Sequence, residues 1–254
     1  MFVAYKLVNN VNAADRTWSQ TDWRGGVSTE VITENGTTFL SQENIDYSNA
    51  GYISLVEEDG WDLDSWGYRA KISFNNTLDN LGVEPENLID FPVLVELDDE
   101  VNIDYSKTND DGSDIRFVDT DGSLLSYEID SWDESGISYV WVKIPQINIG
   151  NEDYIYIYYG NSSASDAQDS SSVWSSGYKA VFHNTDQGTD ILENSLGTDN
   201  AVKASINEPL ATDGTLNGAE YYDGVNDYSK INSNFIVNPG ELTLASCFTK
   251  ERGG

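Results

Sequence analysis

The first residues that could carry chemistry are acidic side chains in a turn-like loop. The stretch Asn109-Asp110-Asp111-Gly112-Ser113-Asp114 places carboxylate, amide and hydroxyl oxygens close together along the chain. Hard cations such as calcium are bound by several oxygen ligands from loops of this composition. The sequence therefore predicts Asp110, Asp111 and Asp114 as candidate calcium ligands. The alternative is turn chemistry, in which Asp and Asn side chains bond their own backbone.

Alternating tyrosines form the second candidate site. The run from Tyr154 to Tyr159 alternates so that Tyr154, Tyr156 and Tyr158 share one face of a predicted strand, while Ile155 and Ile157 share the other. Aromatic rings on an exposed face could pack against the apolar faces of sugars. This pattern predicts a glycan-binding platform of three tyrosines. The alternative is a strand inside the core whose hydroxyl groups reach the rim.

The sequence gives little basis for catalysis. His183 is the single histidine and lies in an apolar run, which favours a strand residue over a general base. Cys247 is the single cysteine and has no basic residue just before it, so it is a poor candidate nucleophile. Carboxylate pairs suited to glycoside hydrolysis arise by chance among 44 Asp and Glu residues. We therefore predict a protein without enzymatic activity.

The charge of the chain restricts its partners. Its 254 residues include 13 Lys and Arg against 44 Asp and Glu, a formal net charge of −31. Such a surface repels nucleic acid and anionic lipid headgroups, so neither is an expected partner, and it attracts metal ions. Screening in a salty medium would relieve the self-repulsion. No apolar run is long enough to span a bilayer, so no membrane insertion is predicted within this chain.

Two kinds of short motif bear on location. Val11-Asn12-Ala13 has the small-residue spacing of a secretory cleavage site, although an ordinary frayed terminus explains it as well. Asn-x-Ser/Thr motifs begin at Asn35, Asn75 and Asn161. They fit an exported chain, but they also arise by chance in Asn- and Ser-rich sequence.

The elements that must hold the candidate residues are predicted β-strands. From residue 61 onward, short apolar runs are separated by Asp, Gly and Pro at the spacing of an antiparallel sandwich. Asp119-Thr120-Asp121-Gly122 predicts a tight hairpin in which Gly122 supplies a positive φ. The predicted strands are Tyr68–Phe74, Asp90–Leu97, Asp114–Val118, Leu124–Ile129, Tyr139–Ile144 and Tyr154–Tyr159.

The flanking sequence is less regular. Residues 1–60 predict a β-rich N-terminal extension, with a turn near Trp23 and strands expected at Thr29–Ile32 and Gly51–Val56. Ser162–Ser172 is rich in Ser, Asp and Ala, which suits a linker. Later strands are expected within the runs Tyr178–His183, Ala219–Tyr228 and Leu242–Ser246. The predicted domains are 1–60, 61–175 and 176–254.

Several of these motifs, taken in order, resemble a known family, the domain of unknown function DUF2341. The resemblance covers about residues 61–175 and implies a domain of surface and exported proteins of bacteria and archaea, with no established activity. The residues that carry it are Trp66-Gly67-Tyr68-Arg69, Gly112-Ser113-Asp114-Ile115-Arg116-Phe117, Tyr127-Glu128-Ile129, Trp132, Trp141-Val142-Lys143-Ile144-Pro145 and Tyr158-Tyr159-Gly160-Asn161.

The C-terminal part resembles the front of a concanavalin A-like (laminin G-like) module. The residues that carry this likeness are Val181-Phe182-His183, Asp190, Asn194 and the run from Gly218 to Tyr228. Tyr222 stands where that family has Phe, and the tryptophan expected after Leu244 is missing. The region is shorter than a jelly-roll sandwich requires, so a truncated module is expected.

This second resemblance implies a further metal site and completes the prediction. Asp223, Asn226 and Asp227 correspond to a loop that can hold calcium, although a tight hairpin explains them equally well. The predicted fold class is all-β: a DUF2341-like antiparallel β-sandwich, a β-rich N-terminal extension and a truncated concanavalin A-like jelly-roll. We predict a non-catalytic extracellular or cell-surface protein that binds a glycan or another surface component. Two alternatives stay open, a structural spacer of a cell-envelope protein and a fragment of a polysaccharide-acting enzyme.

Overall fold

The computed structural model describes residues 65–99, 101–175, 177–185, 190–203, 209–214, 216, 218–231 and 243–248, together with the backbone of four short strands before residue 65. These strands form two pairs, β1 (Ile32–Glu34) with β2 (Thr37–Phe39) and β3 (Ile45–Asp46) with β4 (Ser54–Leu55). The strand expected at Gly51–Val56 contains β4. The turn expected near Trp23, the cleavage-like spacing at residues 11–13 and the Asn35 motif lie outside the described residues.

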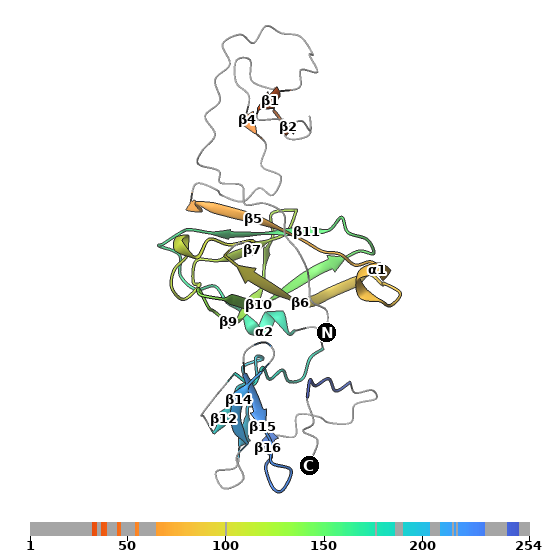
Figure 1. Cartoon of the computed structure of the whole chain (residues 1–254), viewed down its shortest axis with the longest axis vertical. Helices are drawn as coiled ribbons and strands as arrows, with labels where there is room; N and C mark the ends of the chain where they lie inside the picture. Colours follow the sequence, from red (N-terminus) through yellow and green to blue (C-terminus); the bar gives the residue numbers. More distant parts are fainter. Residues whose placement is uncertain are drawn as a thin grey trace. The chain divides into compact units, whose positions relative to one another are not determined.

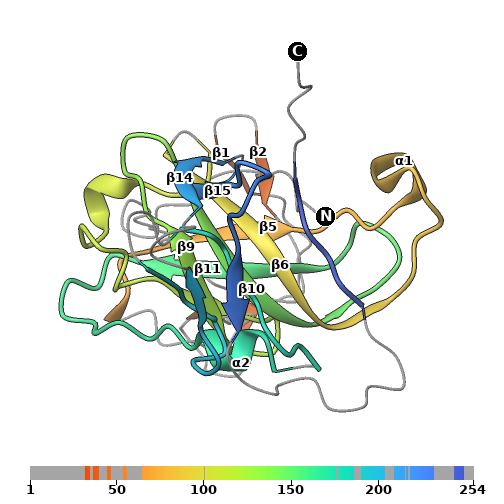
Figure 2. The ribbon, with the colours of Figure 1, turned by 90° about the horizontal axis from the view of Figure 1, so that it is seen from below.

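Contacts between Cα atoms divide the chain into unit 1, residues 1–176, and unit 2, residues 177–254. Residues 65–175 of unit 1 contain two antiparallel sheets that face each other as two layers (Figure 1). Seen from below, the strands of the two layers run in different directions (Figure 2). One sheet has the order β6-β10-β9, with bounds Leu88–Asp98, Ile137–Ile147 and Tyr127–Ser131. The other has the order β5-β11-β7-β8, with bounds Tyr68–Ser73, Tyr154–Tyr159, Arg116–Val118 and Leu124–Leu125.

Period-two alternation builds the core between these sheets. In β10, Val140, Val142 and Ile144 are buried, while the residues between them are half-buried and face away. Ile155 and Ile157 of β11 point into the same interior from the opposite sheet. One continuous hydrophobic cluster results, and burying that apolar area is the main driving force for folding. The prediction of an all-β fold with antiparallel sheets is confirmed.

The connection between β7 and β8 is the hairpin that the sequence predicts. Gly122 has φ +85° and donates its N–H to the Asp119 carbonyl at 3.0 Å. A residue with a Cβ is strained at this φ, so glycine is the natural choice there. Phe117 pairs with Leu125 across the hairpin.

The linker predicted at Ser162–Ser172 is wrong, because this segment is bonded to β9: Gln168 Oε1 accepts the Ile129 N–H at 2.6 Å, and Asp169 donates its N–H to the Tyr127 carbonyl at 2.9 Å. It contains the start of helix α2 (Ser170–Val173), whose first turn is capped by Asp169 accepting the Ser172 N–H. Val173 and Trp174 are buried, and the Trp174 ring lies 5.1 Å from that of Trp141 on the outer face of β10. Composition predicted a linker because the few apolar residues that anchor the segment follow its Ser-rich part.

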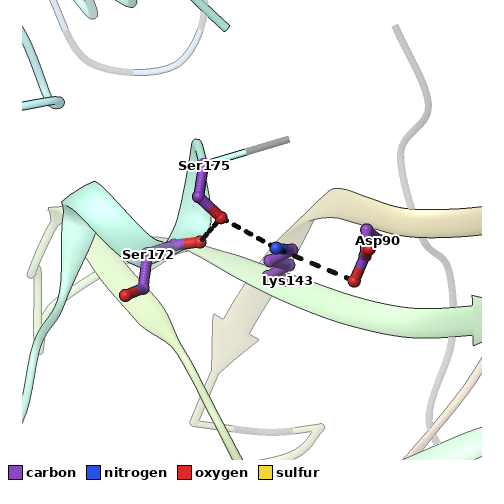
Figure 3. Close-up of polar contacts among 4 residues, drawn as sticks. All are labelled: Asp90, Lys143, Ser172 and Ser175. Atoms are coloured by element: carbon purple, nitrogen blue, oxygen red, sulfur yellow. Dashed lines mark hydrogen bonds and ion pairs between the residues drawn. The ribbon is translucent and has the colours of Figure 1, made fainter. Parts of the chain in front are cut away.

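Polar contacts hold the end of this segment to the sheet, as Figure 3 shows. Lys143 of β10 donates from Nζ to Ser175 Oγ at 2.9 Å and lies 3.7 Å from Asp90 Oδ1 of β6. Ser175 Oγ donates in turn to the Ser172 carbonyl at 2.8 Å. We call residues 162–175 the strap.

Two short helical turns complete the described part of unit 1. They are α1 (Leu78–Leu81), at one end of the two layers, and the 3-10 turn η4 (Tyr105–Lys107). No helix among the described residues is long and apolar enough to cross a membrane.

Unit 2 contains two small antiparallel sheets among its described residues. One has the order β12-β13-β16, with bounds Ile191–Leu192, Ala201–Lys203 and Ser229–Ile231. The other pairs β14 (Leu210–Asp213) with β15 (Gly218–Tyr221). The strand predicted at Tyr178–His183 is wrong, because those residues have no strand pairing. The predicted run Leu242–Ser246 has no strand over its described residues, 243–246.

Candidate functional site

The predicted tyrosine face is the outer face of the β5-β11-β7-β8 sheet. Tyr154, Tyr156 and Tyr158 lie there, with ring centroids 5.6 and 6.3 Å apart in succession. Tyr156 and Tyr158 pack with Trp66 and Val118 in a second hydrophobic cluster, separate from the core between the sheets. The alternation inferred from the sequence is therefore confirmed, because Ile155 and Ile157 belong to the core instead.

Cationic side chains lie on these rings. Arg69 of β5 has its guanidinium carbon 4.5 Å from the Tyr156 ring centroid, and its Nη1 donates to the Tyr158 hydroxyl at 3.1 Å. Lys71 Nζ lies 3.4 Å from the Tyr154 centroid. Cation–π contacts of this kind add to the stability of a packed face. These two cations alternate along β5, as Tyr154, Tyr156 and Tyr158 do along β11, so the contacts follow from the pairing of the two strands.

The burial of this face does not match an open platform of three rings. Tyr158 is 0 % exposed and Tyr156 is 8 % exposed, while Tyr154 is half-buried. A sugar needs access to the flat face of a ring. The three tyrosines therefore form a packed layer and not the exposed platform that the sequence predicts. Tyr154 is the most accessible of the three rings. Sequence reasoning missed Arg69 and Lys71, although their alternation in a predicted neighbouring strand was a usable signal.

The acidic loop at residues 109–114 contains one buried carboxylate that holds the loop in place. Asp114 is 0 % exposed. Its Oδ1 accepts the Asn109 N–H at 2.7 Å, and its Oδ2 accepts the N–H of Gly160, which follows β11, at 3.1 Å. A carboxylate that accepts backbone N–H groups satisfies donors that would otherwise be buried without partners. Asp114 therefore connects the loop to the end of β11.

The rest of the loop lies on the surface. Asp110 and Asp111 are exposed and line a surface depression together with Thr108, Asn109 and Ser113. Asp111 Oδ1 accepts the Ser113 N–H at 3.0 Å, and the Ser113 hydroxyl and N–H lower the pKa of Asp111. These bonds are the turn chemistry that the sequence left open as the alternative.

Gly112 allows this loop to approach the sheet closely. Its φ is +68°, and a Cβ there would lie 2.7 Å from the Trp132 ring. The Trp132 ring in turn lies 5.3 Å from that of Tyr105, in an edge-to-face arrangement. The loop is thus fixed by packing against an indole as well as by Asp114.

The second predicted metal loop, in unit 2, is also organised by its own backbone. Asp223 Oδ1 accepts the Val225 N–H at 2.8 Å, and Asp227 Oδ2 accepts the Asp223 N–H at 2.8 Å. Asn226 donates its N–H to Asp223 Oδ1 at 3.3 Å, and the Val225 N–H lowers the pKa of Asp223. Within the described part of the chain, no cluster of three or more His, Cys, Asp or Glu side chains is arranged to hold a metal ion. Calcium stays a prediction at both loops.

The groups that could serve catalysis are a histidine, a cysteine and a lysine–serine contact. His183 is half-buried outside any strand, and Cys247 is exposed. Lys143 donates to Ser175 Oγ, which itself donates to a carbonyl, so the direction of these bonds is opposite to that needed to deprotonate the serine.

Two buried tyrosines have strongly altered pKa values. Burial raises the pKa of Tyr127 and of Tyr159 to about 12. The Tyr127 hydroxyl donates to the Ile115 carbonyl at 3.0 Å, and the Tyr159 ring stacks on that of Tyr68 with centroids 5.4 Å apart. Both are packing residues of the core.

Unit 2 contains a buried ion pair that the sequence did not indicate. Lys203 Nζ lies 2.8 Å from Glu220 Oε1, and their side chains are 1 % and 2 % exposed. Glu220 Oε2 is buried without a hydrogen-bond partner. Lys203 occupies an inward position of β13, a short strand in which a lysine would normally be placed on the solvent side.

Comparison with known proteins gives one match. Residues 111–194 match the family model described as Domain of unknown function (DUF2341). No curated protein and no solved structure matches the chain. These comparisons give no support to the concanavalin A-like module expected at residues 176–254, which stays a prediction. The matched segment begins in the acidic loop and contains β7 to β11, the strap and β12, so the chain contains a DUF2341 domain at residues 111–194.

Proposed function

We propose that residues 65–175 form a non-catalytic structural module of an extracellular or cell-surface protein. The observation that carries the proposal is that both sheets are covered on their outer faces. Trp66, Tyr156 and Tyr158 form a packed layer over one sheet, and the strap covers the other with Trp174. Aromatic side chains that the sequence offered for ligand binding therefore serve internal packing.

This arrangement suits a rigid spacer. A sheet that is covered on both faces resists deformation, because close-packed side chains on each side must be displaced together. Arg69 adds a bond between β5 and β11, and Lys143 ties the strap to β10. The net charge of −31 favours solubility and repulsion between neighbouring copies, which also suits a surface module.

The test is a replacement made in the full protein on cells that carry it. Residues 65–175 are exchanged for an unrelated β-sandwich of similar length, and antibody access to an epitope placed after residue 254 is measured. A spacer keeps this access after replacement and loses it after deletion. If the folded replacement abolishes attachment of the cells to a surface or partner, the module has a recognition role and the spacer proposal is wrong.

The second candidate is recognition of an anionic glycan at the edge of the tyrosine face. It is favoured by Lys71, whose ammonium lies over the half-buried Tyr154 ring and offers a partner for a sugar carboxylate at the most accessible end of this face. Calorimetry of the full chain with a polyuronate and with a neutral glucan distinguishes the candidates.

If the glycan binds at this edge, the wild-type chain should give a heat of binding with the polyuronate and none with the neutral glucan. The Lys71→Ala variant should give no heat of binding with either. The matched control is Lys107→Ala, which removes an exposed lysine elsewhere in unit 1. Equal heats for Lys71→Ala and Lys107→Ala would exclude this site. No observation favours the remaining expectation, a polysaccharide-acting enzyme, over these two.

A further inference from the structure

Two of the chain's Asn-x-Ser/Thr motifs fall in the described residues, and each begins just after a strand. Asn75-Asn76-Thr77 follows β5, and Asn161-Ser162-Ser163 follows β11. Such a motif accepts an N-linked glycan only where its asparagine is accessible on the surface. The two motifs differ in this respect.

Asn76, the middle residue of the first motif, anchors the segment and so determines which way Asn75 and Thr77 face. Asn76 is buried, and its Nδ2 donates to the Glu86 carbonyl at 2.8 Å and to the Asn148 carbonyl at 3.1 Å. Its backbone exchanges two hydrogen bonds with Gly150, at 2.7 and 2.9 Å. Since neighbouring side chains of an extended chain point to opposite sides, the anchored Asn76 turns its two neighbours outward.

The two outer residues of this motif contact each other on the surface. Asn75 is exposed, and the Thr77 hydroxyl donates to its Oδ1 at 2.7 Å. Thr77 is also the N-cap of α1, with φ −122° and ψ 156°, yet its side chain makes no capping bond. The hydroxyl thus contacts the carboxamide in place of the usual bond to the helix. Among the described residues, Asn75 Nδ2 donates no hydrogen bond.

We infer that Asn75 is an acceptor site for N-linked glycosylation. The inference rests on the proposed surface location, since the transferase and its donor are met during export. Asn75 Nδ2 forms a bond to the anomeric carbon of a lipid-diphosphate-linked oligosaccharide. The bond from that carbon to the phosphate oxygen breaks, the lipid diphosphate leaves with the electron pair, and one Nδ2 proton passes to a base of the transferase.

The second motif is a poorer acceptor and serves as an internal comparison. Asn161 is half-buried, and its Oδ1 accepts both the Ser163 hydroxyl at 2.9 Å and the Ser163 N–H at 3.2 Å. The Ala164 N–H donates to the Asn161 carbonyl at 2.9 Å and closes a turn. The glycan therefore occupies Asn75 in a larger share of molecules than Asn161.

The experiment secretes the full chain through a eukaryotic secretory pathway and measures occupancy of each motif by peptide mass spectrometry. Enzymatic deglycosylation in heavy-oxygen water marks each modified asparagine by conversion to labelled aspartate. The expected result is a modified Asn75 peptide in the wild type and in Thr77→Ser, and its complete loss in Asn75→Gln and Thr77→Ala. The matched control Asn161→Gln leaves the Asn75 peptide unchanged.

An unmodified Asn75 peptide in secreted, folded wild-type chain overturns the inference. Occupancy higher at Asn161 than at Asn75 overturns it as well, because the argument from exposure and anchoring would then be wrong. Failure of the proposed function is seen separately. A chain found only inside its native cells refutes the surface role and leaves the result for the secreted chain intact.

Discussion

The two units bury different kinds of side chain. Unit 1 encloses a continuous apolar cluster contributed by both of its sheets, including Leu97, Phe117 and Val140 at 0 % exposure. In the described part of unit 2, the buried apolar residues are Leu192, Ala201 and Pro209, and the buried polar ones are Asn194 and Lys203. Unit 1 is thus held by apolar burial, and the described part of unit 2 by specific polar partners.

The difference shows how two kinds of interaction specify structure. Apolar burial stabilises in proportion to area and tolerates many arrangements. A buried ion pair gives little net stability, because desolvation offsets the attraction, but losing one partner is costly. Asn194 is equally specific, since its side chain bonds the Val181 N–H, the Leu196 N–H and the Thr198 carbonyl.

The largest predicted effect is a loss of stability of unit 1 in alkaline solution. Tyr127 and Tyr159 ionise near pH 10 when unfolded, but burial raises the pKa of each to about 12 in the folded unit 1. Their contribution to stability is complete below pH 10 and is lost as the pH rises from 10 to 12. Each pKa unit corresponds to about 1.4 kcal/mol. Ionisation of both tyrosines should therefore lower the free energy of unfolding by roughly 5 kcal/mol between pH 10 and pH 12.

Thermal unfolding followed by circular dichroism across this pH range measures the loss. Tyr127→Phe is the matched variant, because it keeps the ring and cannot ionise. It should remove about half of the alkaline destabilisation. An unchanged pH dependence in this variant would show that Tyr127 is not buried in solution.

The second prediction tests the apolar core directly. Phe117→Ala removes a fully buried ring from β7 and leaves a cavity, so the free energy of unfolding of unit 1 should fall by about 4 kcal/mol. Denaturant unfolding followed by hydrogen exchange in peptides of unit 1 measures it. The control is Val225→Ala, a residue 82 % exposed in unit 2, which should change stability by less than about 0.5 kcal/mol. If Phe117→Ala and Val225→Ala lower the free energy of unfolding by similar amounts, unit 1 is not held by apolar burial in the way proposed.

The third prediction concerns the ion pair of unit 2. Lys203→Met leaves the Glu220 carboxylate buried without its partner and should lower the stability of unit 2 by about 3 kcal/mol. The double variant Lys203→Met with Glu220→Leu should recover most of that loss. Hydrogen exchange in peptides covering β13 and β15 measures both. If the double variant is no more stable than Lys203→Met alone, Lys203 and Glu220 are not buried together as an ion pair.

The same contrast explains what the sequence could predict. Alternation predicts β5 and β11 and assigns Ile155 and Ile157 to the opposite face from Tyr156, because a buried face requires period two. Apolar runs at strand spacing predict β6 and β10. The hairpin at Asp119–Gly122 followed from turn chemistry. These features depend on residues that are neighbours in the sequence.

Features that depend on distant partners were missed. Alternation shows which side chains share a face but not what covers that face, so the sequence leaves a platform and a packed strand both open, and it does not show that Tyr158 contacts Arg69. The composition of Ser162–Ser172 predicts a linker, because it does not show that Gln168 bonds the distant Ile129 of β9 or that Trp174, just beyond this stretch, packs on Trp141. Lys203 was not suspected, because only the fold brings Glu220 to it.

The smallest predicted effect compares the two acidic loops. In Asp114→Asn, the amide can present only one acceptor oxygen where the carboxylate receives N–H groups from Asn109 and Gly160, so unit 1 should lose about 2 kcal/mol. Asp223→Asn changes an exposed carboxylate in unit 2 and should lower the melting temperature much less. Differential scanning calorimetry with and without calcium measures both variants. If calcium raises the wild-type melting temperature and Asp114→Asn abolishes that rise, Asp114 is a metal ligand in solution and its role as an internal tie is wrong.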